Sequence, residues 1–322
     1  MRNFKTPILL GLFFILMVLM SYHWISPENG DYEYRAINGR GLLTWTGPFY
    51  PCVIEYEVGE KEISYEGNTP IFGTDNKGSD SAYRISEALW TNIWLAFIAA
   101  LVFIIFAIIG GVLIGYDQSH HSGAPSIKNG NYFEYIRRLR KVKLGQLFAK
   151  LLVETLHAIP MLLLLLVVVI VANGLFEDDL IRMLVVMVAI GILSIPKLAL
   201  LIRDRIYVLE DEEFINAAKA SGLSDIKIII THILWYECSP IIAGQFIYVI
   251  VQAIMLEAVI SFLGYGVGID YSTLGGLIKQ FQGNFPGTIG GTPLALLPLI
   301  VLLLVAVVGN GFTNLFMKLR HE

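Results

Sequence analysis

The stretch "EFINAAKASGLSDIKIIITHI", residues 213–233, is polar, is broken once by Gly222, and lies between two long apolar runs. It is too polar to cross a bilayer, whereas an apolar run of about 20 residues has the length that spans the hydrocarbon core. Across all 322 residues, 55% are hydrophobic and only 16% are charged, and the mean hydropathy is +0.65. Because the apolar residues come in blocks, the sequence predicts an all-α integral membrane protein.

Six apolar runs are candidates for transmembrane helices. They cover residues 7–25, 89–116, 151–173, 180–202, 240–263 and 293–316. The first run resembles a secretory signal, but the "SYHWISPEN" at its end, residues 21–29, is not a small-residue cleavage site. We therefore expect a retained transmembrane anchor at residues 1–25 and six transmembrane helices in total.

The distribution of Lys and Arg predicts the orientation of these helices. The loop at 117–150 carries seven basic residues and the loop at 203–235 carries four, whereas "NGLFEDD", residues 173–179, carries none. Loops rich in Lys and Arg stay in the cytoplasm. We therefore expect a multi-pass protein of the inner (cytoplasmic) membrane with both termini in the cytoplasm and an enlarged cytoplasmic insert at 117–146.

Residues 26–88 then form a long extracytoplasmic segment. Within it, "CVIEYEVGEKEISYEG", residues 52–67, has two short alternating runs on either side of "GEK", a pattern typical of a β-hairpin. We therefore expect a small extracytoplasmic insert that contains β-strands. Two interpretations of this insert stay open, a solvated cap over the helices and a docking surface for an external partner.

The polar stretch itself predicts an elbow of two helices. Phe214, Ala217, Ala218 and Ser221 stand at i, i+3, i+4 and i+7 and form one face of a short helix, which we expect to be exposed. Gly222 is a candidate C′ glycine that ends this helix. A second helix, capped by Ser224, then leads toward the fifth apolar run. Such an elbow can bind a soluble partner, or it can rest on the lipid surface as an amphipathic helix.

The elbow resembles a known sequence motif. "NAAKASGLSDIKIIITHIL", residues 216–234, is similar to the EAA loop of ABC-importer permeases. Ala217, Ala218 and Gly222 match that motif, whereas Asn216 stands where glutamate is usual and Trp235 where proline is usual. The resemblance implies that residues 210–235 contain a coupling helix that contacts a separate ATPase. The residues implied in this contact are Phe214, Asn216, Ala217, Ala218 and Gly222.

Three further stretches narrow the resemblance to the C-type permeases of dipeptide, oligopeptide and nickel importers. They are "FGTDNKGSDSAYRI" at 72–85, "GGVLIGY" at 110–116 and "LEAVISFLGYGV" at 256–267. The resemblance covers about residues 70–318 and implies a type I ABC-importer permease fold, with its transmembrane domain at 89–318. It implies transport of peptides, with nickel or another small solute as the alternative.

Five residues are candidates for a translocation pathway or gate. A charged side chain deep in a membrane costs about 2.5–3.5 kcal/mol on insertion scales, so Glu257 in the fifth run either lines the pathway or is hydrogen-bonded within the protein. Pro160 lacks a backbone donor and is expected to kink the third helix. Gly264, with the neighbouring glycines, is expected to make the end of the fifth helix a flexible outer gate. The remaining candidates, Ser261 and Phe262, lie in the same matched motif.

The sequence carries no motif for covalent chemistry. It contains no G-x-x-x-x-G-K-[ST], H-E-x-x-H or G-x-S-x-G, and no Cys/His spacing typical of a metal site. The net charge of −4 and the lack of a basic stripe argue against nucleic-acid binding. We therefore expect no catalytic residues, metal or cofactor.

The resemblance implies a second homologous permease, two cytoplasmic ATP-binding subunits, an extracytoplasmic substrate-binding protein and membrane lipid as partners. The alternatives are an ion-driven secondary transporter and a membrane enzyme.

Overall fold

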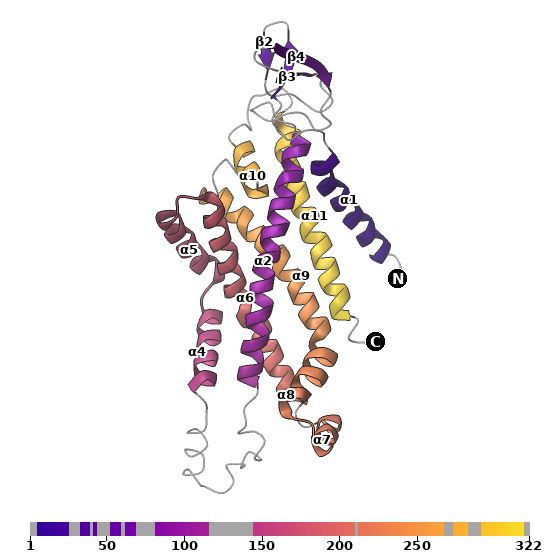
Figure 1. Ribbon diagram of the computed structural model, residues 1–322, viewed down its shortest axis with the longest axis vertical. Coiled ribbons are helices and arrows are strands. Elements are labelled where there is room, and N and C mark those ends of the chain that lie inside the picture. The colour runs from indigo at the N-terminus through magenta and orange to yellow at the C-terminus, as the bar shows by residue number, and fades with distance from the viewer. Residues whose placement is uncertain are drawn as a thin grey trace. The chain divides into compact units, whose positions relative to one another are not determined.

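The computed structural model describes residues 5–25, 33–38, 41–43, 52–58, 62–68, 81–115, 144–209, 212–266, 273–282 and 291–318. Figure 1 shows its helices and strands. The chain divides into two compact units. The first unit contains Met1–Phe97, Val169–Val185 and Ile250–Phe312, and the second contains Ile98–Val168, Val186–Val249 and Thr313–Glu322. Several helices contribute one part to each unit, so we describe the packing within each unit separately.

The described residues are predominantly helical, as the hydropathy predicts. The helices are α1 (Lys5–Ile25), α2 (Ser81–Gly115), α4 (Leu144–Ala158), α5 (Met161–Leu175), α6 (Asp179–Leu209), α7 (Glu213–Ala220), α8 (Asp225–Ile228), the π-helical η3 (Ile229–Cys238), α9 (Ser239–Phe262), α10 (Leu274–Gln282) and α11 (Gly291–Lys318). Among the described residues, four helical stretches are long and apolar enough to cross a membrane, and the bent pair α4–α5 would make a fifth. In α1, Ile8–Ser21 forms a shorter apolar helix.

Four short strands form an antiparallel sheet within the first unit. They are β1 (Glu33–Asn38), β2 (Gly41–Leu43), β3 (Cys52–Val58) and β4 (Glu62–Asn68), and their order in the sheet is β2-β1-β3-β4. β3 and β4 pair across the stretch in which the alternation predicts a hairpin, with Val58 opposite Glu62. The segments 72–80 and 116–143, which include parts of two matched motifs and most of the enlarged loop, lie outside the described residues.

Small residues allow the helices of the first unit to approach one another closely. A Cβ on Gly311 of α11 would overlap the side chain of Leu9 in α1, and a Cβ on Gly309 would overlap Val251 in α9. The Ser86 hydroxyl in α2 donates to the Met20 carbonyl at 3.2 Å. In a bilayer, helices associate largely through such close packing, because lipid tails are as apolar as the side chains.

In the second unit, small residues likewise allow α2, α6, α9 and α11 to pack closely. A Cβ on Gly111 in α2 would lie 2.8 Å from Cβ of Ile202 in α6, and a Cβ on Gly191 would overlap the Ala99 carbonyl. The Thr313 hydroxyl in α11 donates to the carbonyl of Gly244 in α9 at 3.3 Å, both within this unit. Gly111 and Gly115 of "GGVLIGY" therefore serve as contact points for α6.

The third predicted transmembrane helix is broken rather than continuous. Its two parts, Ala149–Ala158 and Met161–Leu175, are bent by 97° at the break formed by Ile159 and Pro160. A kink at Pro160 is predicted because proline lacks a backbone N–H. The observed bend is far sharper than the predicted kink, since the two parts lie almost at right angles. Beyond the break, the N–H groups of Leu163 and Leu164 donate to the Pro160 carbonyl at 3.0 and 3.4 Å, which starts α5.

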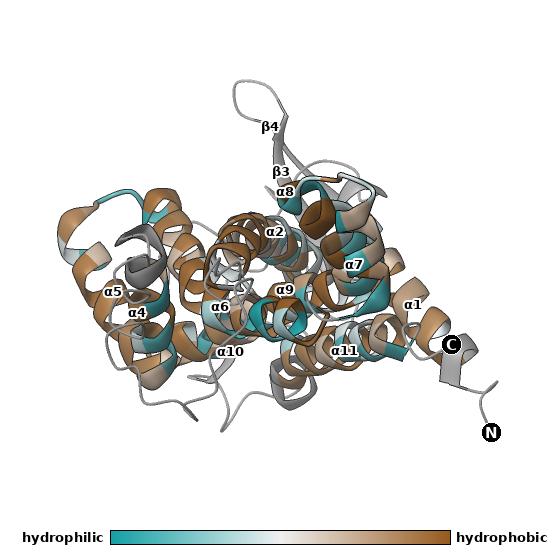
Figure 2. Ribbon diagram, turned by 90° about the horizontal axis from the view of Figure 1, so that it is seen from below, coloured by the Kyte–Doolittle hydropathy of each residue, from teal (hydrophilic) through white to brown (hydrophobic). Residues whose placement is uncertain are grey.

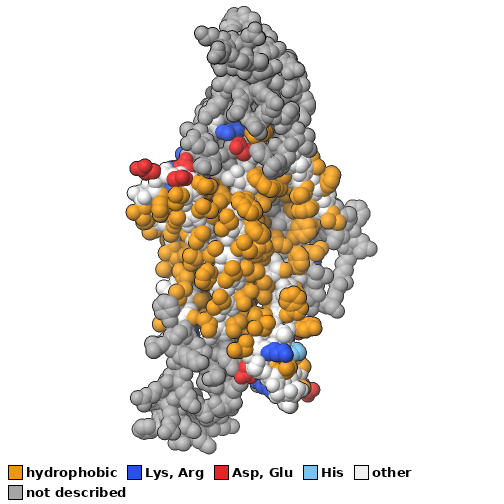
Figure 3. Space-filling view, viewed as in Figure 1, with side chains coloured by type: hydrophobic (Ala, Val, Ile, Leu, Met, Phe, Trp, Pro, Cys, Tyr) orange, Lys and Arg blue, Asp and Glu red, His pale blue; other side chains and the backbone are white. Residues whose placement is uncertain are grey.

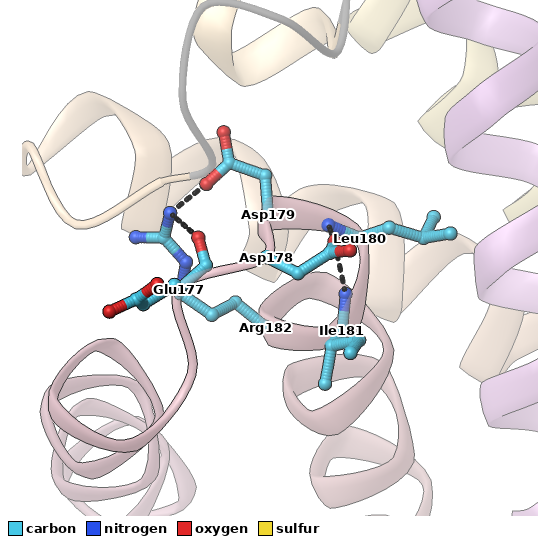
Figure 4. A network of polar contacts seen from close by, with 6 residues as sticks. All are labelled: Glu177, Asp178, Asp179, Leu180, Ile181 and Arg182. Carbon is cyan, nitrogen blue, oxygen red and sulfur yellow. Dashed lines mark hydrogen bonds and ion pairs between the residues drawn. The ribbon is translucent and has the colours of Figure 1, made fainter.

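Acidic side chains set the start of α6 (Figure 4). The Asp178 carboxylate accepts hydrogen bonds from the backbone N–H groups of Leu180 at 2.7 Å and Ile181 at 3.3 Å. Arg182 forms an ion pair with Asp179 and donates to the Glu177 carbonyl at 3.1 Å. A carboxylate at this position satisfies N–H groups that have no partner within the helix and complements the positive end of the helix dipole.

The surface of the described helices is largely apolar. Hydrophobic side chains cover most of the described face in Figure 3, and the charged side chains gather in a few small groups. Figure 2 shows the same contrast, with largely hydrophobic helices and hydrophilic residues on α7. Soluble proteins rarely expose so large an apolar surface, so lipid or other membrane-embedded chains are the environment that this surface fits.

Candidate functional site

The elbow predicted at residues 213–234 is present and has a defined turn. Glu212 precedes α7 with extended backbone angles, and Glu213 places negative charge in the first turn. Gly222 has φ of 81° and donates its N–H to the Lys219 carbonyl at 3.0 Å, while Leu223 donates to the Ala218 carbonyl at 3.3 Å. These two bonds form a Schellman motif, which confirms Gly222 as the C′ residue of α7.

One residue of the predicted exposed face of α7 is buried. Phe214, Asn216 and Ala217 are exposed, whereas Ala218 is only 8% exposed and forms an inner face with Ile215. The prediction that Ala218 lies on the exposed face is therefore wrong. The Gly222 turn folds α8 back against α7, and positions three residues apart on a helix share a face, so Ala218 follows Ile215 inward.

Aromatic rings extend the exposed surface of α7 onto η3. The Phe214 ring lies 6.4 Å from that of His232, and His232 stacks on Tyr236 at 6.3 Å. Tyr236 and its neighbour Trp235 are 73% and 74% exposed. The elbow therefore presents small residues on α7 beside a row of rings, and aromatic residues are enriched in protein–protein interfaces.

The second helix of the elbow leads directly into α9, as predicted. Residues from Asp225 to Phe262 form one helical stretch. Ser224 takes the N-cap position, although its side chain makes no capping hydrogen bond. The π-helical part of this stretch, which the sequence analysis did not predict, ends two residues before Pro240. Proline cannot donate a backbone hydrogen bond and clashes with the carbonyl one turn before it, which is a common cause of such a local change in a helix.

A second polar site lies inside the first unit around Glu257. The Asn92 amide in α2 donates to the Glu257 carboxylate at 3.0 Å, and the Ser261 hydroxyl donates at 2.6 Å. The Thr273 side chain and the Gly275 backbone also hydrogen-bond this carboxylate. We call these five residues the Glu257 cluster, and all five are buried. The hydrogen bonds offset the cost of burying a polar group.

The predicted pathway residues do not form one group. Glu257 and Ser261 lie together in the Glu257 cluster, whereas the Phe262 side chain is 48% exposed. Gly264 ends α9 with φ of 94°, a value that favours glycine. Pro160 belongs to the other unit. The contacts of Glu257 match the hydrogen-bonded alternative left open by the sequence.

Three members of the Glu257 cluster were missed by the sequence analysis. Asn92 lies near the start of the second apolar run. Because a buried amide needs a hydrogen-bond partner, its position in an apolar run could have indicated a buried polar contact. Thr273 precedes "LGG", a pattern that could indicate a helix cap followed by a close contact.

In the part of the chain that the structure describes, no group of three His, Cys, Asp or Glu residues is arranged to hold a metal ion.

Comparison with known proteins relates both sites to one family. Residues 135–320, which are 186 of the 322 residues, match the family described as "Binding-protein-dependent transport system inner membrane component". The chain belongs to this family. As a member of the inner membrane component family it is a multi-pass membrane protein, consistent with its long apolar helices. The matched region contains the whole elbow as well as α9 and α10.

Two relatives of this chain carry names from peptide transport. A Brucella suis protein, named as a permease of a peptide transport system, is 25% identical over 65% of this chain and 60% of its own length. The dipeptide transport system permease protein DppC of Alkalihalophilus pseudofirmus is 28% identical over 68% of this chain and 62% of its own length. The chain thus matches about three fifths of each relative.

A chain of the MetNI methionine ABC transporter, in inward-facing conformations, is 13% identical and has a TM-score of 0.48. The likeness covers 73% of this chain and 96% of that chain.

Proposed function

We propose that this chain is the membrane-spanning permease subunit of an ATP-driven importer, and that the importer carries peptides. The observation that carries this proposal is the α7–α8 elbow within the family match at 135–320. The elbow places Phe214 and Ala217 on an exposed face beside the rings of η3. A separate ATPase that receives this face would be coupled mechanically to the helical stretch from Asp225 to Phe262.

In this function the chain performs no covalent chemistry. Two ATP-binding subunits would each bind a coupling helix, and a second homologous permease would complete the pathway. ATP binding and hydrolysis act only through the different affinities of the ATPases for the two conformations of the permease pair. Phe214 would anchor the contact, since fully burying a phenylalanine contributes roughly 1.5–3 kcal/mol. Asn216 and Ala217 would lie beside it, and Gly222 would set the angle of the elbow.

The topology that we propose has six transmembrane helices. The four long apolar helices and the bent α4–α5 pair supply five, and α1 supplies the sixth. Both termini and α7 would lie in the cytoplasm, and the four-stranded sheet would form an extracytoplasmic insert. The Glu257 cluster would then belong to the outer half of the permease domain at 89–318, where an external substrate-binding protein delivers its cargo.

Peptides are the proposed cargo because the two relatives are named for peptide and dipeptide transport. The test is uptake of a labelled dipeptide into proteoliposomes that contain the purified complex with its partner subunits and binding protein. We expect uptake with ATP but not with a non-hydrolysable analogue, and none with a proton or sodium gradient alone. Uptake driven by an ion gradient without ATP would contradict the proposal, and ATP-dependent uptake of nickel but not peptide would contradict the cargo.

A further inference from the structure

The ends of α9 and α10 contact each other within the first unit. At the end of α9, the N–H of Gly264 donates to the Ser261 carbonyl at 3.0 Å, and the N–H of Tyr265 donates to the Ile260 carbonyl at 3.1 Å. With φ of 94° at Gly264, these bonds form a Schellman motif like the one that ends α7. The motif fixes where α9 ends and leaves its negative dipole end at Gly264.

The start of α10 is bound by a carboxylate from α9. Thr273 caps α10, since its hydroxyl accepts the N–H of Gly276 at 3.0 Å and its carbonyl accepts the N–H of Leu277 at 2.9 Å. The Glu257 carboxylate binds both the Thr273 side chain and the backbone of Gly275, in the first turn of α10. The Glu257 carboxyl group therefore lies at the positive end of the α10 dipole, where the first backbone N–H groups have no partner within the helix.

A positive charge from α10 lies at the opposite dipole end. The Nζ atom of Lys279 is 3.6 Å from the place where a Cβ would stand on Gly264. Lys279 thus brings its ammonium group to the end of α9, where the helix dipole is negative. The two helices are therefore held by reciprocal contacts, in which each supplies a polar side chain to the other's terminus.

Close backbone packing makes this contact specific. A Cβ on Gly275 would lie 2.6 Å from Cα of Ala258 and 2.7 Å from Cβ of Ser261, and a Cβ on Gly266 would overlap Ser261. Only glycine allows α10 to approach α9 this closely. Gly266 and Gly275 therefore serve close packing, and the flexibility expected of the end of α9 stays a prediction. Packed elements switch between discrete arrangements and do not deform continuously, so a contact as tight as this one is either made or broken.

We propose that Glu257 and Lys279 are positioning residues of transport, which hold α10 against α9 in the resting state and release it when the outer end of the pathway opens. Release leaves the Glu257 carboxylate with fewer partners, so α10 stays docked until another contact compensates. This inference rests on the proposed function, because only a transport cycle supplies the opening. The docking itself is independent of that function.

The docking can be measured on the full chain without partners. Leu277 of α10 is 2% exposed, so a cysteine in its place reports whether α10 is docked. In a Leu277→Cys chain with Cys52 and Cys238 replaced by serine, we would follow labelling by a membrane-impermeant maleimide. A buried polar group that loses its partner costs about 1–3 kcal/mol, so Glu257→Gln, which places an amide nitrogen where a carboxyl oxygen accepts, is expected to raise the labelling rate about fivefold or more.

Lys279 provides a variant that is safe for folding, because its side chain is exposed. A charge at a helix terminus contributes about 0.3–1 kcal/mol, so Lys279→Met is expected to raise labelling roughly two- to fivefold, and Lys279→Arg is expected to leave it unchanged. Glu177→Gln and Lys318→Met remove one exposed charge each outside α9 and α10 and serve as matched controls. Equal labelling of all variants would overturn the proposal.

Uptake of labelled peptide by the reconstituted complex then tests the role in transport. We expect Glu257→Gln and Lys279→Met to lower uptake in the order of their labelling rates, with Lys279→Arg restoring it. Faster labelling with unchanged uptake would overturn the positioning role while leaving the docking intact. If the unsubstituted complex takes up no peptide, the proposed function and the positioning role both fall, whereas the labelling rates still decide whether these charges dock α10.

Discussion

Gly191 in α6 lies so close to Ala99 in α2 that a Cβ on Gly191 would overlap the Ala99 carbonyl oxygen. Both residues belong to the second unit, and both are buried. The neighbour is a backbone atom of a long helix, which cannot rotate away as a flexible side chain can. The two helices therefore meet backbone to backbone at this point, and the contact depends on the missing side chain of Gly191.

Gly191→Ala is expected to destabilise the chain. Overpacking a close contact costs about 1–3 kcal/mol, because helices or side chains must shift to make room. The measurement is thermal unfolding of the purified chain in detergent, followed by the loss of the monodisperse species in size-exclusion chromatography. Gly110→Ala is the matched control, since its Cβ would lie an ordinary 3.8 Å from Ala199 Cβ. Equal melting temperatures for the two variants would contradict the backbone contact.

Asn92→Leu is expected to lower the melting temperature in the same unfolding experiment. Asn92 donates to the buried Glu257 carboxylate, and removing one partner of a buried polar group costs about 1–3 kcal/mol, with more for a charged group. Asn310→Leu is the control, because the Asn310 amide donates to a carbonyl of its own helix at an exposed position. A melting temperature for Asn92→Leu as high as that of the control would show that Glu257 does not need this amide.

Gly222→Ala is expected to disturb the elbow without any steric clash. No atom lies within 4 Å of a Cβ at this position, but φ of 81° disfavours any residue with a side chain. The expected cost is about 1 kcal/mol, and less for Gly222→Asn, since asparagine tolerates this conformation better. Peptide uptake by the complex should therefore fall more for Gly222→Ala than for Gly222→Asn. Gly174→Ala, at a helical glycine with equally open surroundings, should leave uptake unchanged.

Pro160→Ala is expected to straighten the α4–α5 pair. Alanine restores the N–H that proline lacks, so the helix can continue through the break. Spin labels at the exposed Leu151 and Val167 would then be about 24 Å apart along a straight helix, against about 16 Å with the observed bend, at 1.5 Å rise per residue. Distances from electron paramagnetic resonance would decide. An unchanged distance would show that packing, rather than proline, bends the pair.

The features that depend on local pattern could be predicted from the sequence. Gly222 follows a short periodic stretch and was correctly assigned as the residue that ends α7. Pro160 correctly marked an interruption, although the angle of 97° could not be derived from one residue. The start of α2 at Ser81 lies well before the apolar run, since hydropathy does not detect a polar helical extension.

The features that depend on contacts distant in sequence could not be predicted. Ala218 lies on the buried side of α7 with Ile215, and periodicity alone does not reveal which side of a short helix is covered. Glu257 was identified as a residue that needs a partner, but its partner Asn92 lies 165 positions away. Nothing in a single sequence links two such residues. The role of Lys279 likewise depends on the closeness of α10 to Gly264, which only the fold provides.

The most direct test of the account is cross-linking of α7 in native membranes. Ala217→Cys places a thiol on the exposed face, and Ile215→Cys places one on the buried face of the same helix, both in a chain whose Cys52 and Cys238 are serine. We predict that only Ala217→Cys cross-links to a soluble nucleotide-binding protein, and that its yield changes with ATP. Reaction of Ala217→Cys with lipid probes alone, without a protein partner, would contradict the account and leave α7 as a helix that rests on the membrane surface.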